Sequence, residues 1–293
     1  MKPNLFIVGA PKCGTTAWVD YLGSHPDIFF CKVKEPHHFS HDFPKWRWFP
    51  VREEYLALFR DSGDAPVVGE GSVRYLYSSV AAREIHNFNP DAKILIFLRN
   101  QEDFLPSVHN QQLYNRDESI ENFELAWRLS GKRTADTLPA CCREPSFLDY
   151  AAMGRFHEQI ERYFDVFPAE QIRVIAFRDW ITDPRHTYLD ILRFLGLEDD
   201  GRIDFPPVNE AKHHKSKRLA SLTQNPAPWV RRTSSLLTRL AGREVGLLTR
   251  LRRANRNMGY RLEADPSLKD EIRRYYESDN RLLSTRITSR APG

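Results

Sequence analysis

Near its N-terminus the chain contains the stretch Leu5-Phe6-Ile7-Val8-Gly9-Ala10-Pro11-Lys12-Cys13-Gly14-Thr15-Thr16. The four apolar residues at its start predict a short buried strand, and residues 17–22 carry apolar side chains at helical spacing. A strand, a glycine-bearing turn and a helix N-terminus together form an anion site, because the first backbone N–H groups of a helix have no partner within it. We call residues 9–16 the anion loop. The residues expected to hold a phosphate there are Pro11, Lys12, Cys13, Gly14, Thr15 and Thr16.

The anion loop differs from the usual nucleoside triphosphate loop, G-x-x-x-x-G-K-[ST], in the position of its lysine. Gly9 and Gly14 have the spacing of that motif, but Thr15 stands where its lysine belongs. The lysine of this loop is Lys12, which would lie beside the 5′ end of a nucleotide and neutralise a departing phosphate without a metal ion. For this stretch taken alone, a glycine-containing turn without a ligand is the alternative.

The pattern Lys-x-Gly-Thr-Thr after an N-terminal strand resembles the 5′-phosphosulfate loop of sulfotransferases that use 3′-phosphoadenosine 5′-phosphosulfate (PAPS). Residues 21–28 and the segment Lys34-Glu35-Pro36-His37-His38-Phe39 are similar to the heparan sulfate type and its bacterial relatives. The resemblance implies transfer of a sulfuryl group from PAPS to an acceptor hydroxyl, with release of 3′,5′-adenosine bisphosphate (PAP). It also implies that Lys12 stabilises the leaving phosphate and that no metal takes part.

Glu35 is the residue that the resemblance makes the general base for the acceptor hydroxyl. Pro36 follows it and biases its backbone toward an extended or turn conformation. A carboxylate near bound sulfate and phosphate has its pKa raised by like charge, which suits a base. From composition alone, a surface glutamate in a turn is the alternative.

Three histidines follow Glu35 closely, and Arg74 follows a second predicted strand, residues 66–72. No Cys or carboxylate stands at zinc-ligand spacing from the histidines, so we expect them to line the acceptor site, where one of them could replace Glu35 as base. Heparan-type enzymes often have a lysine where this chain has Gly71, and Arg74 is a candidate substitute for its charge. The acceptor-site candidates are therefore His37, His38, His41 and Arg74.

Aromatic residues alternate with Lys and Arg over residues 45–55, including Trp46 and Trp48. This composition suits stacking on sugar rings or contact with an anionic acceptor, and packing in the core is an equal alternative.

Residues 93–98 form the clearest buried strand, an almost continuous apolar run of the kind found in parallel sheets. Arg99 stands at its carboxyl end, where open α/β sheets bind ligands, and a helix is predicted over 102–114. The resemblance implies that Arg99 binds the 3′-phosphate of the donor with its two-pronged guanidinium and that Ser107 donates to the same group.

Strands alternating with helices over residues 5–197 predict an α/β, P-loop-like, three-layer fold with a central parallel sheet flanked by helices. Helices are predicted over 81–88, 119–129 and 147–164, from an Asp183 cap to a Gly196 stop, and over 265–283. We expect residues 1–293 to form one domain, in which 1–205 is the α/β core and 206–293 adds a basic loop and C-terminal helices.

The C-terminal third has a strongly basic segment. Residues 211–261 contain thirteen Lys and Arg and one acidic residue, Glu244, while the whole chain has a formal charge of +4. The resemblance implies that Lys215, Lys217 and Arg218 belong to a loop that closes over the nucleotide. The helical pattern over 229–253 fits either helices packed on the sheet with a solvated basic face or attraction to a membrane surface or polyanionic acceptor.

Composition places the chain among ordinary globular proteins, with 28% charged residues and no apolar run of membrane-spanning length. The four cysteines do not suggest a disulfide or metal framework. Eukaryotic carbohydrate sulfotransferases usually carry a membrane anchor, and this sequence shows none, so we expect a cytoplasmic, bacterial enzyme. Its expected partner is a hydroxylated small molecule, glycan or lipid rather than a nucleic acid, and the sequence does not define its oligomeric state.

Two rival functions stay open at this point. A P-loop kinase would need a lysine at the Walker position and a carboxylate for magnesium, and neither is convincingly placed. A non-catalytic protein would instead use the basic segment to bind an anionic surface.

Overall fold

The computed structural model describes residues 1–207, 212–214, 256–258 and 264–288. The chain divides into two units, Met1–Asn209 with Glu263–Gly293, and Glu210–Leu262. In the second unit, β6 (Lys212–His214) pairs antiparallel with β7 (Arg256–Met258). The predicted nucleotide-loop residues Lys215, Lys217 and Arg218 and the helical pattern over 229–253 lie outside the described residues.

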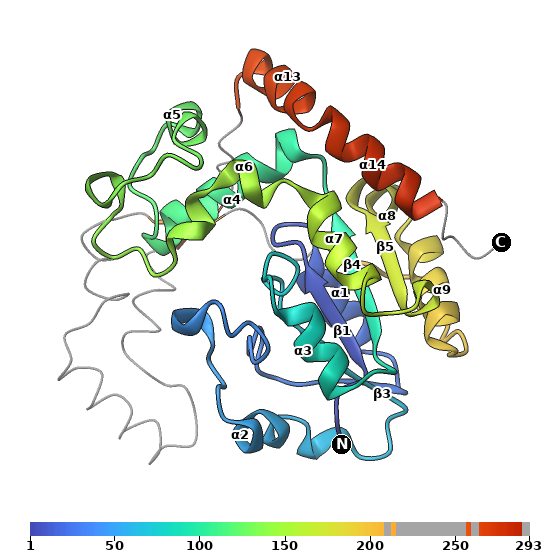
Figure 1. Cartoon of the computed structure of the whole chain (residues 1–293). Helices are drawn as coiled ribbons and strands as arrows, with labels where there is room; N and C mark the ends of the chain where they lie inside the picture. The colour runs from blue at the N-terminus through green and yellow to red at the C-terminus, as the bar shows by residue number, and fades with distance from the viewer. Residues whose placement is uncertain (208–211, 215–255, 259–263, 289–293) are drawn as a thin grey trace. The chain divides into compact units, whose positions relative to one another are not determined.

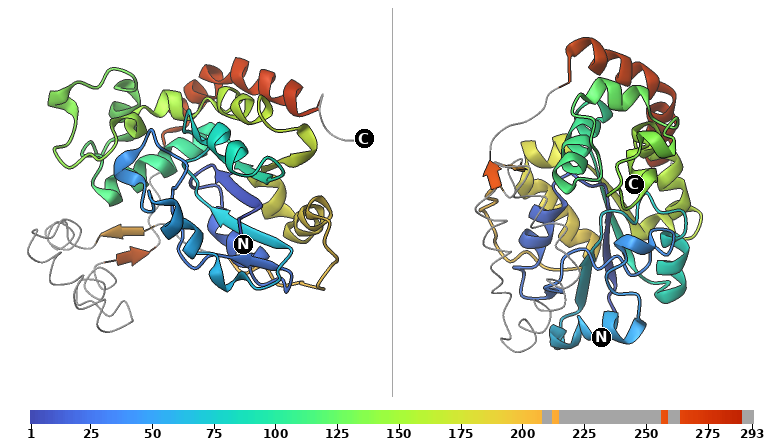
Figure 2. Two further views of the ribbon diagram at one scale, coloured as in Figure 1. Left: turned by 60° about the horizontal axis from the view of Figure 1, so that its bottom comes forward. Right: turned by 90° about the vertical axis from the view of Figure 1, so that its left-hand side faces the viewer.

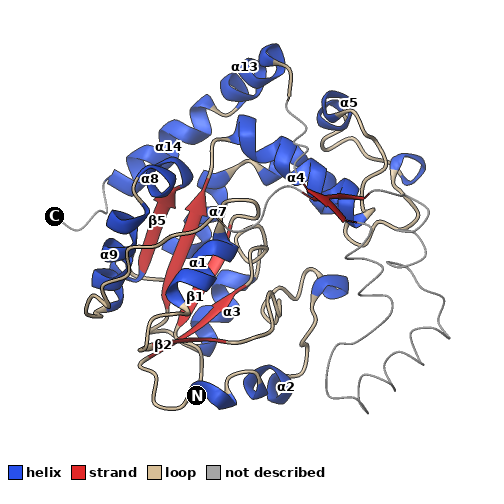
Figure 3. Cartoon of the chain, turned by 180° about the vertical axis from the view of Figure 1, so that it is seen from behind, coloured by secondary structure: helices blue, strands red, loops and turns tan. Residues whose placement is uncertain are grey.

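A five-stranded parallel sheet forms the centre of the first unit (Figure 1, Figure 3). Its strands are β1 (Leu5–Gly9), β2 (Ile28–Phe30), β3 (Val67–Gly71), β4 (Lys93–Leu98) and β5 (Ile172–Ala176). They lie in the order β2-β3-β1-β4-β5. Because every neighbouring pair is parallel, all five carboxyl ends meet at one edge, which we call the carboxyl edge.

Helices cover both faces of this sheet, as Figure 2 shows. On one face lie α1 (Thr15–Leu22), α8 (Phe177–Thr182) and α9 (Pro184–Leu195), and on the other α3 (Ala81–Phe88) and α7 (Phe156–Phe164). This arrangement confirms the predicted three-layer α/β fold.

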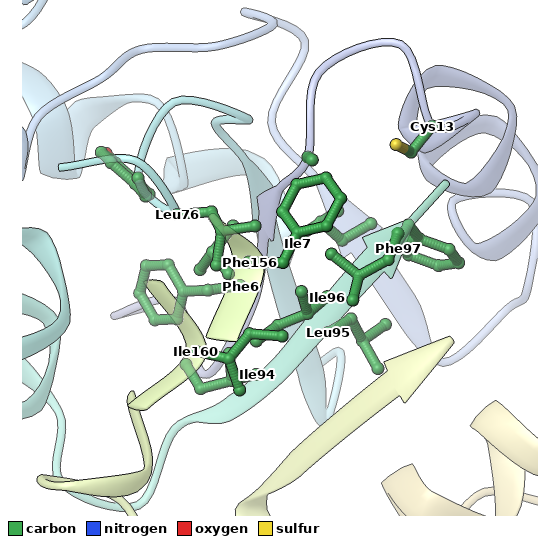
Figure 4. Packing of buried hydrophobic residues seen from close by; sticks show 14 of the residues in the cluster. Phe6, Ile7, Cys13, Leu76, Ile94, Leu95, Ile96, Phe97, Phe156 and Ile160 are labelled. Carbon is green, nitrogen blue, oxygen red and sulfur yellow. The ribbon is translucent and has the colours of Figure 1, made fainter. Parts of the chain in front are cut away.

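The core lies between these layers and follows from the apolar strands. Trp18 of α1 stacks on Phe97 of β4, with ring centroids 5.5 Å apart. Figure 4 shows residues of the same buried cluster, including Phe6 of β1 and Ile160 of α7. Strands covered on both faces must be apolar throughout, which explains why β1 and β4 carry so few polar residues.

The remaining helices lie around these layers. They are α2 (Arg52–Ala57), α4 (Gln101–Asn115), α5 (Phe123–Arg128), α6 (Tyr150–Met153), α13 (Pro266–Tyr275) and α14 (Glu277–Thr288). Near the C-terminus, α13 packs on α4 and α14 packs on α7. The ammonium group of Lys269 lies 3.1 Å from a carboxylate oxygen of Asp103, which fixes α13 to α4.

Several predicted elements are confirmed with little change. The predicted ranges 81–88 and 93–98 match α3 and β4. The α9 helix starts where Asp183 accepts a hydrogen bond from the His186 N–H at 2.8 Å. It ends at Gly196, whose φ of 74° is the left-handed conformation common at helix ends.

The single helix predicted over 147–164 is wrong, because the chain there forms α6 and α7 with a break at Gly154. The hydroxyl of Tyr276 donates to the carbonyls of Tyr150 and Ala151, at 3.1 and 2.9 Å. A Cβ on Gly154 would lie 2.5 Å from that hydroxyl oxygen. A contact with a residue more than 120 positions away therefore ends the helix.

Two other helices differ from their predicted bounds. The helix expected over 119–129 is only α5, because Asn122 caps it by accepting from the Leu125 N–H at 3.0 Å. The closing helix expected over 265–283 is two helices, α13 and α14, divided at Tyr276.

Replacing Tyr276 by Phe removes the hydroxyl that donates to the carbonyls of Tyr150 and Ala151. We expect the free energy of unfolding to fall by about 1–2 kcal/mol, because the Ala151 carbonyl loses this donor and the Tyr150 carbonyl keeps only the Gly154 N–H. Tyr275→Phe is the control, because Tyr275 is exposed and should change stability by less than about 0.5 kcal/mol. Urea denaturation followed by circular dichroism measures both values, and equal losses in the two variants would contradict the assignment.

Candidate active site

The anion loop turns sharply at Gly14, directly before α1. Gly14 has a φ of 83°, and a Cβ at this position would lie 2.2 Å from a ring carbon of Trp180 in α8. No other residue therefore fits here without moving the indole. The turn places the N-terminus of α1 at the carboxyl edge, where its first N–H groups and the positive end of its dipole face a common space.

The side chains of the anion loop are positioned by its neighbours. The Lys12 ammonium donates to Gln111 Oε1 on α4 at 3.3 Å, and Thr16 Oγ1 accepts a hydrogen bond from the Lys34 ammonium. Thr15 is buried in the first turn of α1. Cys13 is fully buried, and burial raises the pKa of its thiol to about 12, so it contributes packing and a backbone N–H rather than a thiolate.

One face of α4 joins the two predicted phosphate sites. Arg99 follows β4, its guanidinium lies 3.8 Å from the Asp103 carboxylate, and it stands over the Phe177 ring at 4.7 Å. Asp103, Ser107 and Gln111 are spaced by four residues and so share a helix face. Because Asp103 contacts Arg99 and Gln111 contacts Lys12, Ser107 lies between these two cations.

Glu35 lies on the other side of the anion loop, after β2. Its carboxylate is 3.7 Å from the Lys34 ammonium and 3.3 Å from Nε2 of His37. Lys34 therefore contacts both Thr16 in the loop and Glu35. The structure brings the predicted base and the predicted phosphate cradle together through a residue that the sequence analysis did not select.

The surroundings of Glu35 and His37 favour the deprotonated form of both groups. Burial alone raises the pKa of Glu35, but the His37 ring and then the charges of Lys34 and Arg74 outweigh it, so its pKa lies below the usual value. Burial lowers the pKa of His37 more than Glu35 raises it. At neutral pH the pair is an ionised carboxylate beside a neutral imidazole. The neighbouring groups of the protein thus lower the pKa of Glu35, whereas the sequence analysis expected the negative charge of a bound donor to raise it.

Backbone strain is concentrated at these residues. Lys12, Glu35 and His37 have φ values of 64°, 57° and 53°, and they are three of the four non-glycine residues with positive φ in the described part of the chain. Each such residue costs about 1–3 kcal/mol and persists only where its surroundings hold it. Glu35 thus takes the turn rather than the extended conformation that Pro36 allows.

A buried network from β3 holds the strained turn. The His37 N–H donates to Ser72 Oγ at 3.0 Å, and the Ser72 hydroxyl donates to Glu70 Oε1 at 2.5 Å. The Tyr55 hydroxyl donates to the other carboxylate oxygen at 2.5 Å. Glu70 has no solvent exposure, and burial raises its pKa to about 7 despite these hydrogen bonds.

The other acceptor-site candidates lie in different surroundings. His38 stacks on Tyr55 with ring centroids 4.3 Å apart and hydrogen-bonds the Phe49 carbonyl through Nδ1 at 2.6 Å. His41 is exposed at the surface. Arg74 is buried against the rings of Trp46 and Phe147, which meet edge to face, with Glu35 among the negative charges that act on it.

Sequence analysis missed three residues at this site: Lys34, Gln111 and Trp180. Gln111 stands four positions after Ser107, so helical spacing could have identified it. The contacts of Lys34 and Trp180 depend on tertiary packing and leave no signal in the sequence.

The residues that the structure describes contain no cluster of three or more His, Cys, Asp or Glu that could hold a metal ion. They also contain no helix that is both long and apolar enough to cross a membrane.

Residues 2–221 match the family described as the sulfotransferase domain. The chain belongs to the sulfotransferase family. This sulfotransferase is similar to the crystal structure of a sulfotransferase from Alicyclobacillus acidocaldarius, with a TM-score of 0.63 and 30% identity over 85% of this chain and 99% of that one. The predicted resemblance is therefore confirmed.

Two curated relatives are carbohydrate enzymes by name. Carbohydrate sulfotransferase 15 of Mus musculus is 25% identical over 285 residues, which cover 78% of this chain and 47% of that protein. Heparan sulfate glucosamine 3-O-sulfotransferase 6 of Mus musculus is 26% identical over 198 residues, covering 67% and 53%. The chain thus spans about half the length of these relatives.

Replacing Glu70 by Gln should remove a pH dependence from the stability of the sulfotransferase. A carboxyl with a native pKa of about 7 and an unfolded pKa near 4.5 binds more protons when folded, so its contribution to stability falls as pH rises through that interval. The glutamine amide does not titrate, so the unfolding free energy of the variant should improve relative to wild type between about pH 4.5 and 7.

Unfolding by urea at several pH values measures this difference. The loss of an acceptor for Ser72 and Tyr55 adds an offset that does not change with pH. Glu54→Gln, on the exposed side of α2, is the control. A difference between Glu70→Gln and wild type that stays constant from pH 5 to 8 would show that Glu70 does not titrate in this way.

Proposed function

We propose that this protein transfers a sulfuryl group from PAPS to an acceptor hydroxyl. The observation that carries the proposal is the contact of Lys34 with both Thr16 and Glu35, which joins an anion-binding helix N-terminus to an ionised carboxylate. An anion cradle alone would suit many nucleotide-binding proteins. A carboxylate poised beside it adds a group that can accept a proton from an acceptor.

The residues present fit a donor with two separate phosphates. The N–H groups of the anion loop, with Thr15, Thr16 and Lys12, would hold the 5′-phosphosulfate. Arg99 and Ser107 would hold the 3′-phosphate, and the shared face of α4 fixes the spacing between the two sites. The Arg99 side chain is only 10% exposed and lies 3.8 Å from Asp103, so its position at the carboxyl edge is fixed before a ligand binds.

When bound, PAPS supplies the sulfuryl group. Glu35 accepts the proton that the acceptor hydroxyl loses as its oxygen bonds to sulfur. Lys12 neutralises the negative charge on the phosphate oxygen whose bond to sulfur breaks. His37, held neutral by burial, keeps the Glu35 carboxylate oriented, and the strained turn limits its movement.

A carbohydrate hydroxyl is the acceptor that we propose first, before a lipid or natural-product alcohol. Trp48 supports it, because 55% of this residue is exposed and its backbone N–H donates to the Pro36 carbonyl at 3.1 Å, next to Glu35. An exposed indole beside the base can stack on a sugar ring. The names of the two curated relatives point in the same direction.

The proposal includes the predictions that the enzyme is cytoplasmic and bacterial and that residues 1–293 form one catalytic domain. It also includes contact of residues 211–261 with a membrane surface, although most of that segment lies outside the described residues.

Replacing Glu35 by Gln tests the proposed base. Turnover with radiolabelled PAPS and a panel of sugars should fall roughly 10²–10⁴-fold, because the variant cannot accept the proton. Its affinity for PAP, measured by calorimetry, should change by less than about threefold, since Glu35 does not hold the phosphates. Glu53→Gln, an exposed substitution on α2, is the control for both measurements.

The same turnover assay distinguishes the roles of Glu35 and His37. If Glu35→Gln keeps full turnover while His37→Gln loses it, His37 is the base and the role given to Glu35 is wrong. If no variant changes turnover, the proton leaves by a route that does not involve this turn.

A further inference from the structure

Arg74 carries a buried charge that the proposed reaction does not use. The residue is 7% exposed, and its guanidinium carbon lies 4.2 Å from the ring centroid of Trp46 and 3.8 Å from that of Phe147. Among the residues that the structure describes, no hydrogen bond or ion pair engages this guanidinium. A buried cation without a hydrogen-bonded partner is costly, so its position calls for a ligand.

The carboxylates nearest to Arg74 are occupied by other groups. Asp117 forms a two-pronged ion pair with Arg143, with contacts of 2.6 and 3.0 Å. Glu144 accepts from the N–H and hydroxyl of Ser146, at 3.3 and 2.8 Å. Glu35 faces His37 and Lys34. None of the three reaches ion-pair distance from Arg74, although all three act on it electrostatically.

The wall behind Arg74 is built to be rigid. The Arg143 guanidinium lies over the Trp46 ring at 3.7 Å, so this indole contacts two arginines. The Asp117 ion pair fixes Arg143 in turn, with the Asp117 side chain only 2% exposed. Arg74 and its ring partners are therefore positioned before any ligand binds, which reduces the entropy lost on binding.

Arg74 also lies on the acceptor side of the candidate active site. It acts electrostatically on both Glu35 and His37, and its ring partner Trp46 lies 6.5 Å from the His37 ring. Lys12 and Arg99 instead contact side chains of α4. The effect of Arg74 on Glu35 is smaller than those of His37 and Lys34, so maintaining the charge of Glu35 does not by itself explain a buried arginine.

We propose that Arg74 recognises an oxyanion, a carboxylate or a sulfate, on the acceptor molecule close to the hydroxyl that is modified. The planar guanidinium, packed in the corner between two rings that meet edge to face, presents N–H groups in the two-pronged geometry that such a group accepts. The acceptor would then be an acidic sugar derivative rather than a neutral one. This inference rests on the proposed function for the location of the acceptor.

A matched pair of ligands tests the inference directly. A saturating concentration of PAP fills the donor site, so an added anion can bind only on the acceptor side. Methyl β-D-glucuronoside and methyl β-D-glucoside differ only by a carboxylate in place of a hydroxymethyl group, and glucose 6-sulfate provides the sulfate form. Quenching of tryptophan fluorescence should show that an acidic ligand binds about tenfold or more tightly than the glucoside. The tighter of the two acidic ligands shows whether Arg74 prefers a carboxylate or a sulfate.

Arg74→Met keeps an apolar stem against the two rings and removes the charge, so it should abolish this preference while leaving glucoside binding unchanged. Arg202→Met is the matched control, because Arg202 also lies over two rings, Tyr21 and Phe205, but at the other end of α1. Equal binding of acidic and neutral ligands by wild-type protein would overturn the inference, even if Arg74→Met failed to fold.

The affinity for PAP separates this inference from the proposed function. If Arg74→Met still binds the acidic ligands more tightly than the glucoside, another residue binds the anion and the role of Arg74 is overturned. Failure of PAP to bind would count against the proposed function. In that case, binding of the glucuronoside and the glucoside to the protein without PAP would still decide whether Arg74 recognises an oxyanion.

Discussion

The left-handed turn at Gly14, closed by Trp180, is the constraint on which the site depends. It starts α1 at Thr15 and directs the first N–H groups of that helix toward the carboxyl edge. Because β1 lies between β3 and β4, the same edge receives Ser72 from one neighbour and Arg99 from the other. The order of the strands thus places the anion loop between Arg99 and the residues that hold Glu35.

Charge and strain divide the site into two halves. On the α4 side, Lys12 and Arg99 contact one face of this helix and supply the positive charge that the proposed donor with two phosphates needs. On the β2 side, a turn with two left-handed residues holds an ionised Glu35 against a neutral His37. The buried Glu70 network stabilises that turn through Ser72, so a carboxyl group without solvent exposure helps to position Glu35.

The sequence predicted the fold and the parts of the site that depend on local pattern. β4, α3 and the caps of α9 follow from apolar runs, helical spacing and a suitable capping residue, which act over a few positions. The break at Gly154 could not be predicted, because it depends on the hydroxyl of Tyr276. The contacts of Lys34, the left-handed backbone of Glu35 and the isolation of Arg74 are likewise products of tertiary packing, so no spacing rule contains them.

The measurement that tests the donor site most directly is calorimetric titration with PAP, with ATP as the competing ligand, on wild type, Arg99→Met and Arg173→Met. Arg173 also stands over a phenylalanine ring and pairs with an aspartate, but it belongs to β5 and lies away from the anion loop. We expect PAP to bind more tightly than ATP and Arg99→Met to lose about tenfold or more in PAP affinity, while Arg173→Met matches wild type. Preference for ATP, or equal PAP affinity in all three proteins, would contradict the account and favour a kinase.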